Sequence, residues 1–201
     1  MAIALVVLAA GQGTRMNSDL PKVLHPIGGA PLLAHALQAG AALEPDRTIV
    51  ITGHGAKAVQ KAGRELDPDA RFILQEEQLG TGHAVRMAET ELKDFDGDVL
   101  VLYGDTPFVR SETLAAMRDR RDAGADLVVL GFDTADPGRY GRLIEKGDRL
   151  EKIVEAKDAT DEELSVTLCN SGLLMASAET LFDLLGKVTN DNGSEEYYLT
   201  D

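Results

Sequence analysis

A glycine-rich segment near the N-terminus has the residue types that bind phosphate. Gly11 and Gly13 follow an apolar run, and two basic residues, Arg15 and Lys22, come next. Glycines allow the backbone to approach an anion closely, and successive backbone N–H groups can form a concave anion site. The sequence therefore predicts a phosphate loop in which Arg15 and Lys22 are the catalytic cations. For the glycines alone, an ordinary turn between a strand and a helix would be the favoured interpretation.

This segment differs from the two most common nucleotide-binding motifs. Met16 stands where the dinucleotide fingerprint needs its third glycine, and no G-x-x-x-x-G-K-[ST] sequence occurs. The sequence also lacks H-E-x-x-H, G-x-S-x-G and the catalytic loop of protein kinases. Hydrolase and kinase activities therefore have no support in the motifs.

One acidic residue stands where a metal ion would meet the phosphates. Asp105 directly follows Tyr103 and Gly104 at the end of an apolar run. Mg²⁺ binds few protein carboxylates and fills its other positions with water and phosphate oxygens. We therefore expect Asp105 to be a Mg²⁺ ligand, and a solvated loop residue is the alternative interpretation. Four scattered histidines have no metal-site spacing, and the single Cys169 excludes an internal disulfide.

Short β-rich runs alternate with helical stretches through the first two-thirds of the chain. This alternation predicts a Rossmann-like, doubly wound, mostly parallel α/β sheet with helices on both faces. Ligands in such sheets bind beyond the carboxyl ends of the strands, where the glycine-rich segment and Asp105 both belong. The expected strands are residues 3–8, 48–52, 71–74, 98–103 and 126–130, and the expected helices are 55–66, 81–92 and those beginning at 31 and 111.

The last third of the chain has an antiparallel, β-rich character. It predicts strands at residues 141–144, 150–154 and 173–175, a polar loop at 155–165, and a helix at 178–186 that ends at a glycine. No linker or repeat interrupts the chain. We therefore expect residues 1–201 to form a single domain with a smaller β-rich lobe, and a cleft between the two parts.

The charge of the chain limits its partners. The formal net charge of the 201 residues is −14, which argues against binding to nucleic acid or to a membrane surface. No apolar run is long enough to cross a membrane, so a cytoplasmic location is expected. Residues 1–40 contain only three charged side chains, Arg15, Asp19 and Lys22. An acidic protein that handles phosphates must concentrate its cations locally, and it needs a divalent metal.

Seven short motifs in a fixed order resemble the sugar-nucleotide pyrophosphorylases. They are LAAGQGTRM at 8–16, LPKVLH at 20–25, QEEQLGTGHA at 75–84, LYGDTP at 102–107, YGR at 140–142, IVEAKDA at 153–159 and NSG at 170–172. Together they resemble the uridylyltransferase half of the bacterial bifunctional N-acetylglucosamine-1-phosphate uridylyltransferase/glucosamine-1-phosphate acetyltransferases. The resemblance implies the nucleotide-diphospho-sugar transferase fold. It also implies transfer of UMP from UTP to N-acetylglucosamine 1-phosphate, with Mg²⁺, giving UDP-N-acetylglucosamine and pyrophosphate.

The resemblance also assigns the substrate-binding residues. The base and phosphates are expected to contact Leu8, Ala9, Ala10, Gly11, Gly13, Lys22, Gln75, Gln78, Gly80, Thr81, Gly104 and Asp105. The sugar is expected to contact Tyr103, Gly141, Glu155 and Asn170. Without the resemblance, these positions would equally be turns, strand ends and polar loops.

The resemblance leaves alternatives at the C-terminal end. The second metal ligand of the family is an asparagine that is expected beyond residue 201, so this chain is expected to be a truncated nucleotidyltransferase domain. The β-helical acetyltransferase half, and the homotrimer that it builds, are expected only in a longer chain. A non-catalytic sugar-nucleotide binding fragment and a transferase for another hexose 1-phosphate are the rival interpretations.

Overall fold

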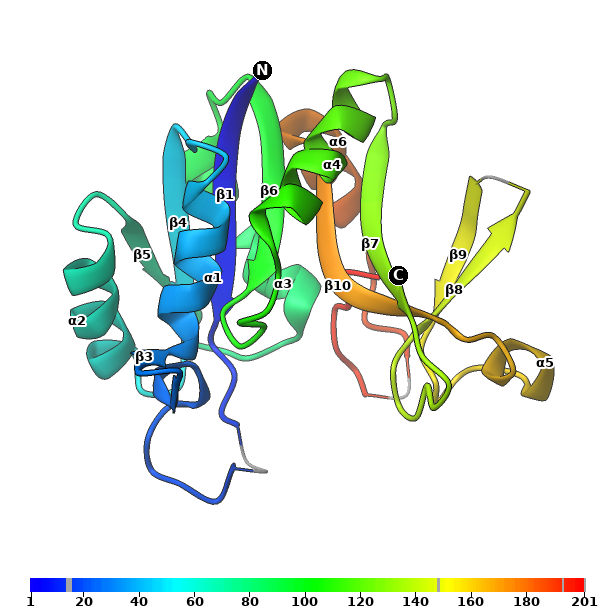
Figure 1. The fold of residues 1–201 in the computed structure, drawn as a ribbon, viewed down its shortest axis with the longest axis horizontal. Helices are drawn as coiled ribbons and strands as arrows, with labels where there is room; N and C mark the ends of the chain where they lie inside the picture. The colour runs from blue at the N-terminus through cyan, green and yellow to red at the C-terminus, as the bar shows by residue number, and fades with distance from the viewer. Residues whose placement is uncertain (14–15, 148, 193, 201) are drawn as a thin grey trace.

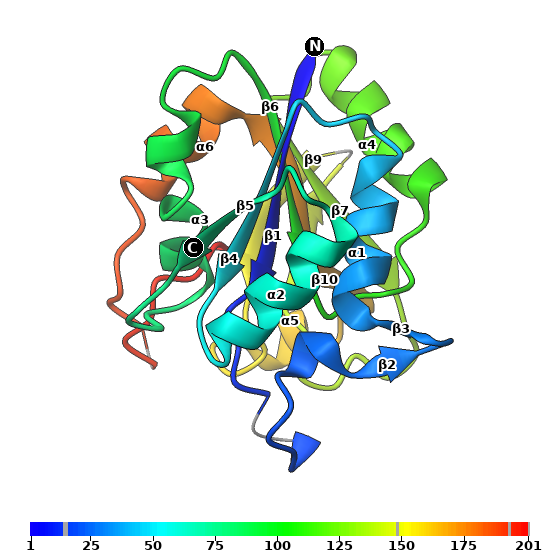
Figure 2. The same cartoon turned by 90° about the vertical axis from the view of Figure 1, so that its left-hand side faces the viewer.

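The computed structural model describes residues 1–13, 16–147, 149–192 and 194–200. They form one twisted, eight-stranded sheet between two layers of helices (Figure 1, Figure 2). The strand order is β5-β4-β1-β6-β10-β8-β9, and β7 pairs with β10 beside this path. The predicted α/β architecture is confirmed. Arg15, the first of the two predicted catalytic cations, lies outside the described residues.

The parallel half of the sheet places several strand ends at one edge. In the pairing register, Leu8 lies opposite Ile51 on one side and Tyr103 on the other. The loops that follow β1 and β6 therefore leave the sheet side by side, at the lower edge in Figure 1. The four parallel strands are β1 (Ala2–Ala9), β4 (Arg47–Thr52), β5 (Arg71–Leu74) and β6 (Gly97–Tyr103).

The other half of the sheet is antiparallel and contains one correction. Its strands are β7 (Leu127–Asp133), β8 (Arg142–Lys146), β9 (Arg149–Val154) and β10 (Leu168–Ser177). The predicted strand at 126–130 is present as β7, but it does not pair with the parallel strands, because β10 pairs with β6 along one side and with β7 along the other. The crossover through α4 (Ser111–Asp122) joins β6 and β7, which run in the same direction, but the antiparallel strand β10 lies between them.

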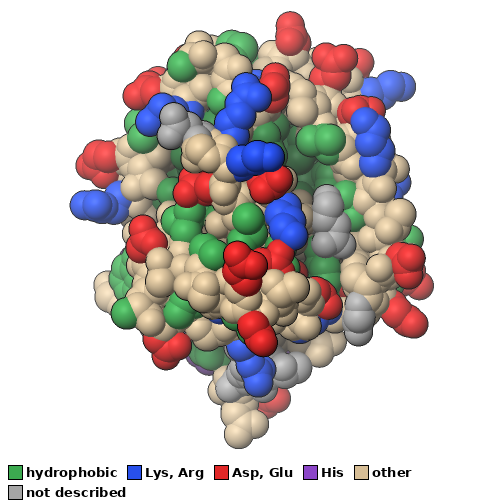
Figure 3. Space-filling model, turned by 90° about the vertical axis from the view of Figure 1, so that its right-hand side faces the viewer, with side chains coloured by type: hydrophobic (Ala, Val, Ile, Leu, Met, Phe, Trp, Pro, Cys, Tyr) green, Lys and Arg blue, Asp and Glu red, His purple; other side chains and the backbone are tan. Residues whose placement is uncertain are grey.

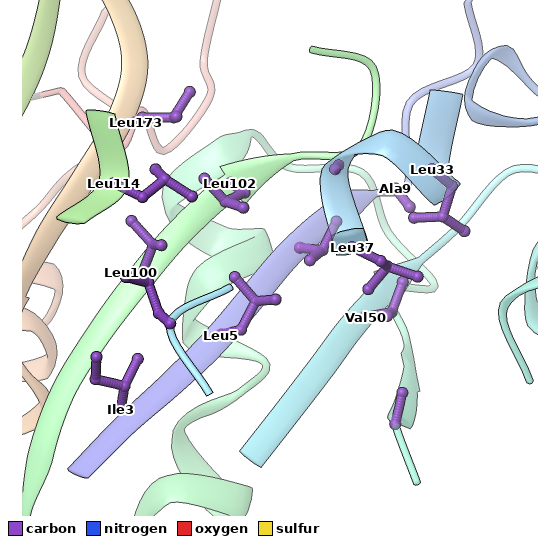
Figure 4. Packing of buried hydrophobic residues seen from close by; sticks show 14 of the residues in the cluster. Ile3, Leu5, Ala9, Leu33, Leu37, Val50, Leu100, Leu102, Leu114 and Leu173 are labelled. Atoms are coloured by element: carbon purple, nitrogen blue, oxygen red, sulfur yellow. The ribbon is translucent and has the colours of Figure 1, made fainter. Parts of the chain in front are cut away.

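Alternate residues of β1 supply two separate cores, one on each face of the sheet. Leu5 and Val7 pack beneath α1 and α4, whereas Ala4 and Val6 pack on the side of α3 and α6. Figure 2 shows these two layers, and Figure 4 shows Leu5 among the leucines of α1, β6 and α4. The helices are α1 (Leu32–Ala41), α2 (Ala56–Leu66), α3 (Thr81–Arg86), α4 (Ser111–Asp122) and α6 (Ala178–Leu185).

Two local predictions also need correction. The helix expected at 81–92 is α3 followed by a 3-10 helix, η3 (Glu89–Leu92), and the tighter winding leaves Leu92 buried in the core. The loop expected at 155–165 contains a one-turn helix, α5 (Asp161–Leu164), which begins with a capping box between Thr160 and Glu163. The remaining short elements are η2 (Lys22–Leu24), β2 (Pro26–Ile27) and β3 (Ala30–Pro31). No helix among the described residues is long and apolar enough to cross a membrane.

Candidate active site

The end of β6 brings Asp105 to the N-terminal loop. The backbone N–H of Gly104 donates to the carbonyl of Leu8 at 2.9 Å, which extends the strand pairing by one residue. The next residue, Asp105, forms an ion pair with Lys22 through its Oδ2 atom. The Lys22 and Asp105 side chains are 35% and 24% exposed, so the pair remains accessible to a ligand. The structure thus brings together two predicted site residues whose mutual contact the sequence did not indicate.

Gly13 allows Lys22 to lie against the loop. Its φ is +63°, and a Cβ atom added at Gly13 would stand 2.6 Å from the Cβ of Lys22. Any larger residue would therefore be strained and would displace Lys22. Gly11 has open space around its Cα, as an anion-binding backbone requires.

The loop after β1 is also held from the side of β4. The carbonyl of Ala10 accepts from the Gln78 amide at 3.0 Å and from the backbone N–H of His54 at 3.1 Å. The amide nitrogen of Gln78 is therefore engaged within the protein. In this structure, Gln78 positions the loop that was predicted to contact the nucleotide.

Gln75, Gly80 and Thr81 lie together between β5 and α3, as predicted. Gln75 is buried, and its amide nitrogen lies 3.3 Å from the Gly80 carbonyl and 2.9 Å from Nδ1 of His83. Gly80 has a φ of +106°, and an added Cβ would be 2.5 Å from the carbonyl oxygen of Tyr197. The contact with His83 was not predicted, because the sequence showed no partner for this histidine.

The predicted sugar-binding residues also meet. The backbone N–H of Asn170 donates to the Gly141 carbonyl at 2.8 Å, and an added Cβ on Gly141 would be 3.4 Å from Oε1 of Glu155. The Asn170 side chain accepts from the backbone N–H of Gly172 at 2.9 Å, which fixes the direction of its amide. A carboxylate, an amide and a glycine backbone therefore lie together, with Gly141 and Asn170 buried.

Tyr103 lies between the base, phosphate and sugar residues. Its ring packs on Gly172, where an added Cβ would be 2.6 Å from Cε2. Burial raises the pKa of Tyr103 to about 12, against a smaller lowering of the pKa by the Thr81 side chain. The negative charges of Asp105 and Glu155 act in the same direction as burial. Tyr103 is therefore neutral at every physiological pH.

A C-terminal segment, residues 194–200, closes the site, and sequence analysis missed it. The Tyr197 carbonyl accepts from Gly82, the Leu199 backbone donates to Thr81, and the Thr200 hydroxyl donates to Glu155 at 3.2 Å. The segment therefore contacts both the residues that are predicted to bind the base and those that are predicted to bind the sugar.

Lys157 forms hydrogen bonds with the same C-terminal segment. Its ammonium group donates to Ser194 at 2.6 Å and to the Tyr198 hydroxyl at 2.8 Å, and it lies 4.9 Å from the centre of the Tyr198 ring. The hydrogen bond to Tyr198 raises the pKa of Lys157. Lys157 therefore links the loop after β9 to the C-terminal segment.

The donor set suits a magnesium ion that arrives with a nucleotide. The described residues contain no group of three or more His, Cys, Asp or Glu side chains that would form a resident metal site. Mg²⁺ needs only one or two carboxylates when phosphate oxygens complete its shell. Asp105, beside the glycine-rich loop, meets that requirement.

A separate apolar groove lies on the side of the molecule that carries β9 and α6. It has a volume of about 470 Å³ and is lined mainly by leucines from β7, β9, β10 and α6. Figure 3 shows hydrophobic side chains in a hollow on the side of the molecule that it views, with acidic and basic side chains around it. None of the predicted site residues lines the groove. The groove and the candidate site at the strand ends therefore share no predicted residue, although Leu199 and Thr200 of the C-terminal segment line the groove.

Comparison with known proteins identifies the family. The family model of the MobA-like NTP transferase domain matches residues 5–195. The chain belongs to this family. The MobA-like NTP transferase domain accounts for nearly the whole chain, so the predicted resemblance to nucleotidyltransferases is confirmed.

The curated relatives are longer than this transferase domain. "Bifunctional protein GlmU" of Dinoroseobacter shibae is 64% identical over all 201 residues, which cover 45% of its own length. The GlmU protein of Ruegeria sp. TM1040 is 62% identical over the same residues, which cover 44% of its length. The chain thus spans less than half the length of these relatives.

Solved structures confirm the fold. UDP-glucose pyrophosphorylase in complex with UDP-glucose superposes with a TM-score of 0.79 at 18% identity, covering 100% of this chain and 85% of that one. A putative glucose-1-phosphate thymidylyltransferase from Bacillus anthracis gives 0.76 at 19% identity, covering 96% and 78%. These similarities place the transferase domain in the nucleotide-sugar transferase fold.

Proposed function

We propose that this domain transfers UMP from UTP to N-acetylglucosamine 1-phosphate, releasing pyrophosphate and forming UDP-N-acetylglucosamine. The observation that carries the proposal is the Lys22–Asp105 pair beside the open loop at Gly11, a cation and a carboxylate at the phosphate-binding edge of a nucleotidyltransferase fold. The identity of 64% to a GlmU protein over the whole chain supports the same activity. The product is a precursor of peptidoglycan and lipopolysaccharide, and we propose the cytoplasm as its place of synthesis.

The reaction needs alignment rather than a protein nucleophile. A phosphate oxygen of the sugar phosphate attacks the α-phosphorus of UTP, the new P–O bond forms, and the bond to the β-phosphate breaks with pyrophosphate as the leaving group. The attacking oxygen already carries negative charge, so no base has to create it. Holding both reactants in line can lower the barrier by roughly 7–11 kcal/mol. The main obstacle is the repulsion between two polyanions.

The phosphate loop and Lys22 counter that repulsion. The backbone N–H groups around Gly11 and Gly13 bind the triphosphate, and Lys22 adds a full positive charge. Asp105 would hold a magnesium ion carried by UTP, and that ion would supply further charge neutralisation at the reacting phosphate. Lys22 then leaves Asp105 for a phosphate oxygen. The ion pair in the free protein keeps both side chains in place until the nucleotide binds.

We infer that specificity comes from two groups of residues, one for the base and one for the sugar. The backbone of residues 8–11 with Gln75, Gly80 and Thr81 contacts the uracil, whose imide edge alternates acceptors and a donor. Glu155, Asn170 and the backbone of Gly141 contact the sugar hydroxyls and the acetamide.

A coupled assay tests the proposal directly. UTP, N-acetylglucosamine 1-phosphate and Mg²⁺ are mixed with the protein, and pyrophosphate release and UDP-N-acetylglucosamine formation are followed. We expect release with this sugar phosphate and not with glucose 1-phosphate. Release with glucose 1-phosphate alone would instead indicate another hexose. Binding of UDP-N-acetylglucosamine without turnover, together with turnover by a longer chain, would make these residues a binding fragment.

A further inference from the structure

The amide of Gln75 has only one orientation that fits its neighbours. Its nitrogen lies 3.3 Å from the carbonyl oxygen of Gly80 and 2.9 Å from Nδ1 of His83. A backbone carbonyl can only accept, so the amide group that faces Gly80 must be the NH₂ and not the oxygen. Because Gln75 is 3% exposed, the amide has little room to choose another arrangement.

This orientation determines where His83 carries its proton. The same NH₂ group that faces Gly80 also faces Nδ1, so Nδ1 must be the acceptor of its second hydrogen. A neutral imidazole has one proton, which must therefore reside on Nε2 of His83. His83 thereby accepts a hydrogen bond from the second amide hydrogen of Gln75, and this bond opposes rotation of the Gln75 amide.

The oxygen of Gln75 is left as the group that is available to a ligand. Within the described residues, no hydrogen bond involves Oε1 of Gln75, and this atom is not among the fully buried atoms that lack a partner. With both hydrogens occupied, Gln75 can only accept a hydrogen bond. An acceptor pairs with the N3–H of uracil, whereas the N3 of cytosine carries a lone pair that would repel it.

We propose that His83 is a positioning residue that selects a base with an imide N–H by holding the Gln75 amide with its oxygen towards the base. The proposal rests on the proposed function in that it takes a nucleotide base as the ligand of Gln75. His83 makes no contact with the base and acts through the orientation of the amide. Replacing it removes the stronger of the two restraints, since the contact with Gly80 is the longer one.

The kinetic test compares UTP with CTP, and 5-methyl-UTP serves as a reference with the same imide edge. In His83→Ala, we expect the ratio of kcat/KM for UTP over CTP to fall by about tenfold or more, while the ratio for UTP over 5-methyl-UTP stays within about twofold. His83→Gln, whose side-chain oxygen can accept in place of Nδ1, should retain most of the selectivity. His35→Ala, which removes a histidine hydrogen-bonded to the Ile27 carbonyl and away from Gln75, is the matched control. An unchanged ratio for UTP over CTP in His83→Ala would overturn the proposal, and so would an equal fall in both ratios.

A second measurement does not depend on catalysis. Nitrogen NMR of the free protein, with His83 assigned by its substitution, reports which ring nitrogen carries the proton. The proposal requires the Nε2–H form, and an Nδ1–H form would refute it whatever the protein catalyses. If the wild-type protein released no pyrophosphate, the proposed function would fail, but the dissociation constants for UTP and CTP would still measure the selectivity.

Discussion

Lys22 and Asp105 form an ion pair across 83 residues of sequence, at the point where the loops after β1 and β6 meet. Both side chains are partly exposed, and such pairs contribute only about 0–1 kcal/mol to stability. The fold therefore gains little from the contact. The position of the pair beside Gly13 explains its presence better than stability does, because the pair holds a cation and a carboxylate where phosphates would bind.

The first prediction concerns this pair. Lys22→Ala and Asp105→Ala should each lower the rate of pyrophosphate release by about 10²–10³, because Lys22 supplies positive charge to the reacting phosphates and Asp105 would hold the magnesium ion. The free energy of unfolding should change by less than about 1 kcal/mol. Lys187→Ala, which breaks an exposed ion pair with Asp183, is the control and should leave the rate unchanged. A near-normal rate in either site variant would remove that residue from the mechanism.

Sequence patterns predicted the parallel half of the sheet well because its signal is local. β1 is buried on both faces and is therefore apolar at nearly every position, and the chain leaves it directly into a glycine-rich loop. Asp105 could be placed in the same way, because the end of a buried strand and a following glycine determine where an acidic side chain emerges. The prediction that ligands bind at the carboxyl ends of the parallel strands therefore required no knowledge of side-chain contacts.

The remaining features depend on contacts between distant segments. The insertion of β10 between β6 and β7 is a tertiary pairing that the order of elements along the chain does not encode. The contact between Tyr197 and Gly80 is also a tertiary contact, and the sequence does not indicate that these two residues lie close together in space. Of the missed features, α5 alone had a visible signal, the Thr160-to-Glu163 spacing of a capping box.

The second prediction compares two glycines with similar backbone angles. Gly172 has a φ of +85° and faces the Tyr103 ring, whereas Gly124 has a φ of +97° and open space around it. Gly124→Ala should lower the free energy of unfolding by about 1–2 kcal/mol, the cost of the left-handed backbone conformation alone. Gly172→Ala should cost a further 1–3 kcal/mol or so, because the new methyl group collides with the ring. Urea denaturation measures both values, and equal losses would show that Tyr103 moves aside freely.

The third prediction concerns a buried ion pair. The Arg121 guanidinium contacts Oδ1 of Asp98 through Nε at 3.1 Å and through a terminal nitrogen at 2.7 Å, and the two side chains are 10% and 3% exposed. Asp98→Ala leaves an unpaired buried cation and should lower the free energy of unfolding by about 3–5 kcal/mol. Asp183→Ala, in the exposed pair with Lys187, should cost at most about 1 kcal/mol. A loss of similar size in both variants would mean that the Asp98–Arg121 pair is solvated in solution.

The last prediction is a dependence of stability on alkaline pH. Burial raises the pKa of Tyr103 to about 12, whereas the unfolded value is about 10. Between these values the folded protein holds a proton that the unfolded chain has lost, so stability is complete below pH 10 and falls as the pH rises towards 12. The total contribution of Tyr103 is about 2–3 kcal/mol.

Comparison with Tyr103→Phe isolates this contribution. The variant should be somewhat less stable at neutral pH, because it lacks the interaction of the Tyr103 hydroxyl with the Thr81 side chain. Between about pH 10 and pH 11, however, its free energy of unfolding should fall less steeply than that of the wild type, because the shifted phenol is absent. Absorbance at alkaline pH provides an independent check, since the late ionisation of Tyr103, near pH 12, should be seen in the wild type and not in the variant. Parallel pH profiles for the two proteins would show that the Tyr103 hydroxyl is open to solvent, and they would remove it from the interior of the site.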